Sequence, residues 1–238
     1  MSLLTTLEHF RRMVALDPVT RAVVEDRLTY LSVGKLRRLQ RALKETGKVE
    51  GDILEFGVAL GGSGIIFALN LGKSRRFLGF DVFQMIPPPT SDKDDPQSKA
   101  RYESIKSGAS EGIGGDKYYG YREDLFTEVK ASFARHDAPV DGHRIILYRG
   151  LFEETWPTVS IGPIALAHID CDWYDPVRFC LHAVADKVSE GGIVIIDDYN
   201  DWGGCRKAVD EFIAERSDYL FEDGPNPFLR KERSARPL

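Results

Sequence analysis

The chain has 238 residues, of which 42% are hydrophobic, a composition that is ordinary for a globular protein and excludes a disordered or collagen-like chain. Its net charge of -5 argues against a nucleic-acid partner, because proteins that bind nucleic acid carry an excess of positive charge. No apolar run reaches the ~20 residues of a membrane span, and three cysteines are too few for a disulfide framework. We therefore expect a cytoplasmic protein without a membrane partner.

Residues 1–50 are expected to form a helical arm with more basic than acidic residues. Its hydrophobic residues recur at three- and four-residue spacing, as at Val24, Leu28 and Leu31 and again at Leu36 and Leu39. This spacing is typical of helices that bury one face. The sequence leaves open whether the arm contacts a second copy of the chain in a homo-oligomer or lines a substrate pocket.

From residue 52 onward, short apolar runs alternate with amphipathic stretches, which is the pattern of a parallel sheet covered by helices. Ser63 and Asp175 are the expected N-caps of two helices, and Pro176 suits a first helical turn. The expected fold is α/β, with a doubly wound and mostly parallel sheet that ends in an antiparallel hairpin. The predicted elements are strands at 52–57, 76–81, 143–149, 163–170 and 192–197, helices at 64–71, 123–135, 176–188 and 204–216, and a hairpin of 218–222 with 226–230.

One long stretch, residues 84–122, shows neither pattern and contains three consecutive prolines at 87–89. Connections longer than ~15 residues are usually functional lids or disordered segments. We expect a lid inserted into the domain of residues 51–238. Tyr118, Tyr119 and Tyr121 would either stack on a bound acceptor or fill the core of the lid.

A glycine-rich turn at residues 55–63 follows the first expected strand and leads into a helix. Read as a dinucleotide-binding fingerprint, it has Ala59 where the second glycine would admit a pyrophosphate. This substitution counts against NAD, whereas S-adenosylmethionine has no phosphate and makes no such demand. Asp81 ends the next strand, where a carboxylate can accept hydrogen bonds from both ribose hydroxyls of either cofactor.

Two further strands end in pairs of aspartates: Asp170 with Asp172, and Asp197 with Asp198. Because the carboxyl ends of parallel strands meet at one edge of the sheet, these four side chains should converge. Carboxylates that lie close together repel unless a cation or protons intervene, and hard oxygen ligands favour Mg²⁺, with Ca²⁺ or Mn²⁺ as alternatives. His168 and Cys171, which neighbour them, are expected to be core residues.

Several of these motifs together resemble the macrocin O-methyltransferases, which are Mg²⁺- and S-adenosylmethionine-dependent enzymes that methylate sugar hydroxyls in natural-product biosynthesis. The resemblance spans roughly residues 51–212 and rests on the segments 54–58, 61–63, 87–89, 150–157, 168–174, 197–199 and 204–209. It implies a class I methyltransferase fold, which is Rossmann-like, and a glycosylated small-molecule acceptor. It also implies the following site: Asp172 as general base, Asp170, Asp197 and Asp198 as metal ligands, and Glu55, Phe56, Gly57, Gly61, Ser63 and Asp81 at the cofactor.

Three other functions remain open from the residues alone. A catechol would chelate Mg²⁺ through its two oxygens much as a sugar diol does, so a catechol-type O-methyltransferase is the nearest alternative. An NAD-dependent oxidoreductase or epimerase is favoured only by the glycine turn and Asp81. In a nucleoside-binding module without catalysis, the aspartates would simply cap helices.

Overall fold

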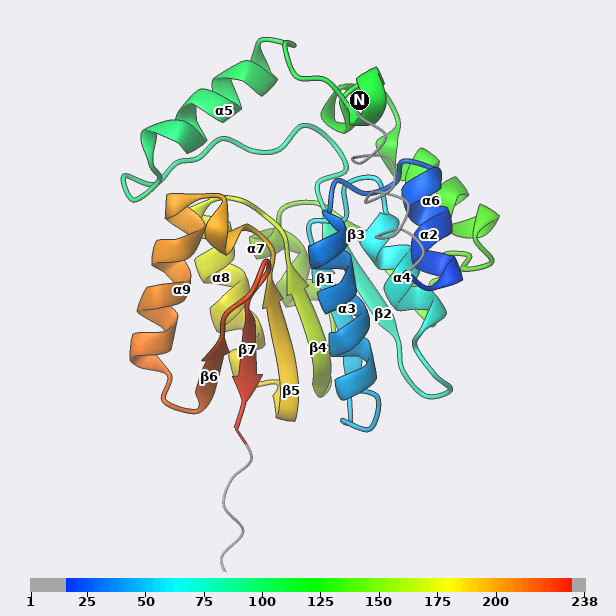
Figure 1. Ribbon diagram of the computed structural model, residues 1–238, viewed down its shortest axis with the longest axis vertical. Helices are drawn as coiled ribbons and strands as arrows, with labels where there is room; N and C mark the ends of the chain where they lie inside the picture. Colours follow the sequence, from blue (N-terminus) through cyan, green and yellow to red (C-terminus); the bar gives the residue numbers. More distant parts are fainter. Residues whose placement is uncertain (1–15, 233–238) are drawn as a thin grey trace, which may run out of the picture.

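The computed structural model describes residues 16–232 and shows a seven-stranded sheet with helices on both faces (Figure 1). The strand order is β3-β2-β1-β4-β5-β7-β6, and only the pairs that involve β7 are antiparallel. The expected doubly wound sheet with a terminal hairpin is confirmed. The strands are β1 Asp52–Phe56, β2 Phe77–Asp81, β3 Ile145–Arg149, β4 Ile164–Ile169, β5 Val188–Ile196, β6 Tyr219–Glu222 and β7 Phe228–Lys231.

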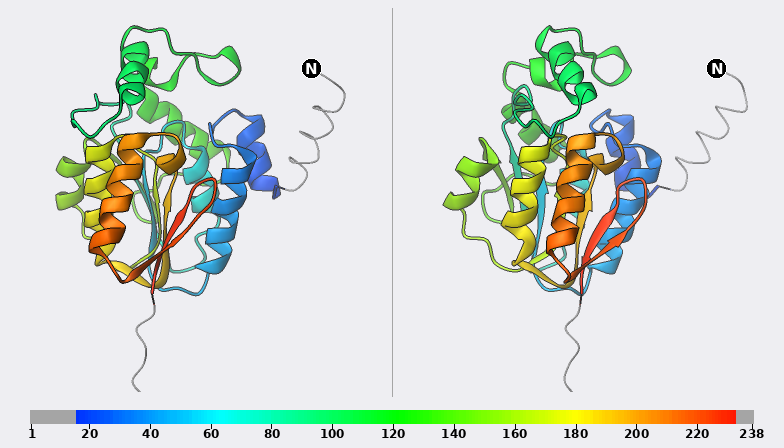
Figure 2. Two further views of the ribbon diagram at one scale, coloured as in Figure 1. Left: turned by 60° about the vertical axis from the view of Figure 1, so that its left-hand side comes forward. Right: turned by 90° about the vertical axis from the view of Figure 1, so that its left-hand side faces the viewer.

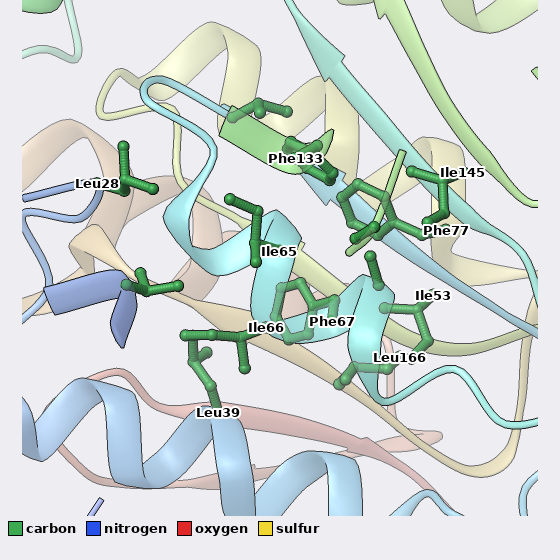
Figure 3. Packing of buried hydrophobic residues seen from close by; sticks show 14 of the residues in the cluster. Leu28, Leu39, Ile53, Ile65, Ile66, Phe67, Phe77, Phe133, Ile145 and Leu166 are labelled. Carbon is green, nitrogen blue, oxygen red and sulfur yellow. The ribbon is translucent and has the colours of Figure 1, made fainter. Parts of the chain in front are cut away.

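Strand residues alternate between two hydrophobic layers, because successive side chains point to opposite faces of a sheet. On one face, Ile53 and Phe77 pack against α3, α4 and α6, and Figure 3 shows Phe67 of α4 and Leu39 of α3 in this layer. On the other face, Leu54 belongs to the cluster formed with α8 and α9. The helices are α2 Pro18–Glu25, α3 Val33–Glu45, α4 Gly62–Leu69, α5 Pro96–Lys106, α6 Leu125–Arg135, α7 Phe152–Thr155, α8 Tyr174–Ala185 and α9 Gly203–Glu215.

The predicted N-caps are wrong, because α4 and α8 begin earlier than expected and contain Ser63 and Asp175 within their first turns. Distant segments satisfy the first amides of both helices instead. The amide of Gly62 donates to the carbonyl of Leu28, and the amide of Tyr174 donates to the carboxylate of Asp94 at 2.9 Å. The prediction of Pro176 in a first turn is confirmed.

The described part of the arm consists of α2 and α3, joined by residues 26–32. The periodicity predicted a helix through Leu28 and Leu31, but these residues lie in the connection, where Leu28 caps α4. Leu36 and Leu39 are fully buried in the main core, so the arm packs on the body. Residues 1–15 of the predicted arm lie outside the described residues.

The expected lid segment is more ordered than the sequence suggested, since it contains the eleven-residue helix α5, which was not predicted. The side chain of Asp95 caps α5 by accepting from the Ser98 amide, and Pro96 occupies the first turn. Figures 1 and 2 show α5 on the carboxyl-end side of the sheet, above the first turns of α8 and α9. Within residues 16–232, no helix has the length and apolar character needed to cross a membrane.

Candidate active site

A cavity of about 1010 Å³ lies between the carboxyl edge of the sheet, the arm and residues 84–122. It opens where the strand order reverses between β1 and β4, which is the usual ligand crevice of a doubly wound sheet. Ligand pockets commonly measure 300–1,000 Å³, so this cavity has room for two small molecules side by side. The wall includes Gly57, Asp81, Asp172 and Lys35.

The glycine turn after β1 is held against the end of β4. Gly57 has a φ of +92°, and a Cβ atom there would lie 1.7 Å from the carbonyl oxygen of Asp170. No residue with a side chain fits at this position. Ala59 also has a positive φ, +46°, which is a strained conformation for alanine.

Asp81 stabilises this strained turn from the end of β2. Its Oδ2 accepts hydrogen bonds from the amides of Val58 at 2.7 Å and Ala59 at 2.9 Å, and its Oδ1 accepts from the amide of Phe83 at 2.6 Å. Burial raises the pKa of Asp81, and the three amides act in the opposite direction. The carboxylate therefore shapes the turn in addition to facing the cavity.

The paired aspartates converge on Asp197. Among the described residues, ligand atoms of His168, Asp170 and Asp197 lie within 4.8 Å of one another, and those of Asp197, Asp198 and Asp201 form a second such group. Asp172 joins them through its amide, which donates to Asp198 Oδ2 at 3.1 Å.

Mutual repulsion and burial shape the titration of this cluster. Burial and the neighbouring charges raise the pKa of Asp170 and of Asp198 well above the ordinary range. Burial also raises the pKa of Asp172 to about 6. Burial alone would raise the pKa of Asp197 as well, but His168 and Lys35 bring it below its ordinary value. Of these four carboxylates, only Asp197 has neighbouring positive groups that outweigh burial and repulsion.

His168 is fully buried on β4, between Glu55 and the aspartates. Its Nδ1 lies 3.0 Å from Glu55 Oε1, and its Nε2 lies 3.8 Å from Asp197 Oδ1, beyond hydrogen-bond distance. Burial alone would lower the pKa of His168, but Asp197 and Glu55 raise it to about 10. His168 is therefore a buried, hydrogen-bonded residue, as expected, and Cys171 is buried too.

Most of this chain matches the model of one known protein family. Residues 5–218 match the model of the macrocin-O-methyltransferase (TylF) family. The chain belongs to that family. As a macrocin O-methyltransferase family member, it is an O-methyltransferase, and the family predicted from the sequence is confirmed.

Two curated relatives are similar to this chain over most of its length. Demethyldecarbamoylnovobiocin O-methyltransferase of Streptomyces niveus is 28% identical over 197 residues, covering 79% of this chain and 68% of that protein. The 8-demethyl-8-(2,3-dimethoxy-alpha-L-rhamnosyl)-tetracenomycin-C 4'-O-methyltransferase of Streptomyces olivaceus is 30% identical, covering 80% of this chain and 70% of that protein.

The structure of the O-methyltransferase NovP has a TM-score of 0.72 and 25% identity, covering 87% of this chain and 83% of that one. The calicheamicin methyltransferase CalS11 shares the fold, with a TM-score of 0.62 and 21% identity over 97% of this chain and 93% of that one. The class I methyltransferase fold expected from the resemblance is thereby confirmed.

The structure separates the predicted site residues of this chain into two groups. On the cavity wall lie Gly57, Ser63, Asp81, Asp170, Asp172, Asp197 and Asp198. Glu55, Phe56 and Gly61 were predicted at the cofactor but do not line the cavity. Glu55 bonds to His168, Phe56 packs in the hydrophobic layer beneath α8, and Gly61 abuts Phe133 of α6.

Sequence reasoning missed Lys35, which enters the site from α3. Its Nζ lies 2.7 Å from Asp197 Oδ2 and 2.7 Å from Asp201 Oδ2. It also missed Arg101, which lines the cavity from α5 and donates to Ser110 Oγ at 2.9 Å. For Lys35, the only signal in the sequence was the excess of basic residues in the arm, which does not identify a single lysine.

The lid tyrosines were expected either to fill the core of the lid or to stack on a bound acceptor, and the structure bears on both roles. The ring centroid of Tyr118 lies 4.4 Å from that of Tyr119 and 5.1 Å from that of Tyr121, so the three form a small core within the segment. Tyr118 and Tyr119 also line the cavity. The arm lines it as well, through residues 28–32 and Lys35.

Proposed function

We propose that this protein transfers the methyl group of S-adenosylmethionine to a hydroxyl of a sugar moiety on a small-molecule acceptor, and that it uses Mg²⁺ to do so. The observation that carries the proposal is the meeting of four carboxylates, from the ends of β4 and β5, with the glycine turn on the wall of one cavity.

The donor set fits a hard divalent ion. Asp170, Asp197 and Asp198 offer only carboxylate oxygens, which are the ligands that Mg²⁺ and Ca²⁺ prefer in proteins. Burial first, and then the charges of the neighbouring aspartates, raise the pKa values of Asp170 and Asp198. A divalent ion supplies positive charge at these carboxylates, and we assign these three residues as its ligands.

Asp172 is the proposed general base, since it lies on the cavity wall shortly after the end of β4 and hydrogen-bonds through its amide to Asp198 of the ligand cluster. A bound divalent ion lowers the pKa of a coordinated hydroxyl and orients it for attack. Asp172 then needs only to accept the proton as the methyl group is transferred. Its backbone is left-handed, with a φ of +59°, a conformation that is uncommon for residues other than glycine.

The glycine turn is the proposed cofactor site. Gly57 lets the ligand approach the backbone closely, and Ser63 offers a hydroxyl. Asp81 can accept from one ribose hydroxyl, with the single lone-pair site that its three amide donors leave free. S-adenosylmethionine supplies a methyl group on a sulfonium. Glu55, Phe56 and Gly61 do not line the cavity, and we propose that they support the conformation of the glycine turn without contacting the cofactor.

The proposal of a sugar acceptor draws on the relatives, one of which is named for a rhamnosyl derivative of tetracenomycin. We further propose that residues 51–238 form the methyltransferase domain, with residues 84–122 as its lid over the acceptor. The arm then completes the pocket wall, which gives residues 28–35 a role in the site of a single chain.

The decisive experiment incubates the full-length protein with labelled S-adenosylmethionine and a panel of glycosylated natural products, catechols and their aglycones. We expect methylated glycosides by mass spectrometry, with activity lost in EDTA and restored by Mg²⁺. Methylation of catechols alone would replace the sugar with a catechol acceptor. Unchanged activity in EDTA would reject the magnesium role, and calorimetry with Mg²⁺ provides the independent binding measurement.

A further inference from the structure

Lys35 lies inside the acidic cluster although its helix belongs to the arm. Its ammonium forms two ion pairs of 2.7 Å, with Asp197 Oδ2 and Asp201 Oδ2, and its side chain is only 15% exposed. Among the described residues, it is the only lysine or arginine in ion-pair contact with any of Asp170, Asp172, Asp197 and Asp198. The arm therefore brings positive charge to a cluster that otherwise repels itself.

The position of Lys35 is fixed by the loop before β7. Asn226 is fully buried, and its Nδ2 lies 3.4 Å from the carbonyl oxygen of Lys35 and 3.5 Å from Asp197 Oδ1. Arg38, one turn further along α3, donates to the carbonyl of Asn226 at 3.0 Å and stacks on the Phe228 ring at 3.8 Å. Such a lysine differs from a solvated surface residue, because both its backbone and its ammonium are held.

Lys35 also shares a ligand with the proposed metal site. Its ammonium takes Oδ2 of Asp197, which leaves Oδ1 of the same carboxylate beside His168 Nε2 and Asn226. A divalent ion bound to Asp197 would lie within a few ångströms of a fixed positive charge. At that separation like charges repel strongly, even at the effective dielectric constant of a protein surface.

We propose that Lys35 is a resident counter-cation of the acidic cluster, which stabilises the cluster without metal and competes with the divalent ion at Asp197. The arm thereby sets the metal affinity of the site. The counter-cation role follows from the contacts of the described residues, and the competition at Asp197 rests on the magnesium site proposed above.

The test compares the full-length wild-type protein with Lys35→Met, Lys35→Arg and Arg37→Met. Arg37 is exposed on the same helix, so its substitution removes one positive charge without touching the cluster. Two measurements are made on each protein: the melting temperature in EDTA, and the affinity for Mg²⁺ alone by calorimetry.

We expect Lys35→Met to lower the melting temperature in EDTA by roughly 5 °C or more, because it leaves a buried carboxylate unpaired. We also expect it to bind Mg²⁺ about tenfold more tightly than the wild type, since the competing charge is gone. Lys35→Arg should restore both values toward those of the wild type, and Arg37→Met should change neither.

The outcomes separate this inference from the proposed function. If the wild type binds Mg²⁺ and Lys35→Met binds it with equal or lower affinity, the competition is overturned while the magnesium site stands. An unchanged melting temperature of Lys35→Met in EDTA overturns the counter-cation role. If neither protein binds Mg²⁺, the magnesium site of the proposed function fails and the competition fails with it. Binding by Lys35→Met alone supports the inference.

Discussion

The carbonyl oxygen of Asp170 lies 1.7 Å from the point where a Cβ atom on Gly57 would stand. These two residues follow the adjacent parallel strands β1 and β4, and the amide of Asp170 donates to the carbonyl of Phe56 at 2.8 Å. The turn proposed to hold the cofactor and the strand end proposed to hold the metal are therefore in direct contact. We therefore expect a substitution that displaces one of them to displace the other.

Gly57→Ala should disrupt both regions at once. Its Cβ would overlap a backbone atom that cannot rotate away, and its φ of +92° disfavours alanine. We expect a loss of roughly 3 kcal/mol or more in the free energy of unfolding, measured by denaturant titration, and no measurable binding of S-adenosylhomocysteine. Gly72→Ala is the matched control, because Gly72 also has a positive φ but open space around it. Equal losses in the two variants would show that backbone strain, and not the contact with Asp170, is responsible.

Asp81→Asn should loosen the glycine turn. The asparagine side chain has one acceptor oxygen in place of two, so at least one of the amides of Val58, Ala59 and Phe83 would face an NH₂ group. Leaving a buried amide unsatisfied costs about 1–3 kcal/mol, so we expect a comparable loss of stability and weaker binding of S-adenosylhomocysteine. The control, Asp92→Asn, changes an exposed residue. Stability and affinity at the wild-type level in Asp81→Asn would contradict the role of this carboxylate in the turn.

Asp172→Asn should separate turnover from binding. If Asp172 accepts the proton of the acceptor hydroxyl, the amide cannot replace it, and kcat should fall by about 10²-fold or more. Affinity for S-adenosylhomocysteine should stay within about twofold of the wild type, since among the described residues Asp172 hydrogen-bonds to Asp198 and not to the glycine turn. Calorimetry and steady-state kinetics measure the two quantities. A kcat near the wild-type value removes Asp172 from the mechanism.

Asp141, which lies away from the site, should contribute to the stability of the fold in a pH-dependent way. Its pKa falls to about 2, because its carboxylate accepts hydrogen bonds from the amides of Ile145, His143 and Arg144 ahead of β3. The folded-state pKa lies below the unfolded one, so the contribution is present above about pH 4 and is lost as the pH falls through about 2. Asp141→Ala should lower the melting temperature by roughly 2–4 °C at pH 7. That difference should shrink as the pH falls from 4 to 2, and a constant difference would contradict it.

Much of the sheet could be predicted because its signals are local. Apolar runs such as residues 164–169 predict parallel strands that are buried on both faces, and the amphipathic stretches between them predict the helices that cover the sheet. The ends of the elements were less predictable. Ser63 and Asp175 are good capping residues, but their helices begin earlier because Leu28 and Asp94 satisfy the first amides from a distance.

The α/β class, the family and the convergence of four aspartates at one edge could be predicted from the sequence, because they depend on strand patterns and on short motifs. The pairing of Lys35 with Asp197, 162 positions away, and the support that Asp81 gives to the glycine turn became apparent only in the folded chain. Such pairs depend on where the arm and the strands pack. Lys35 is one of ten basic residues in the arm, and its sequence neighbours do not indicate which carboxylate it contacts. Its role is therefore apparent only in the folded structure.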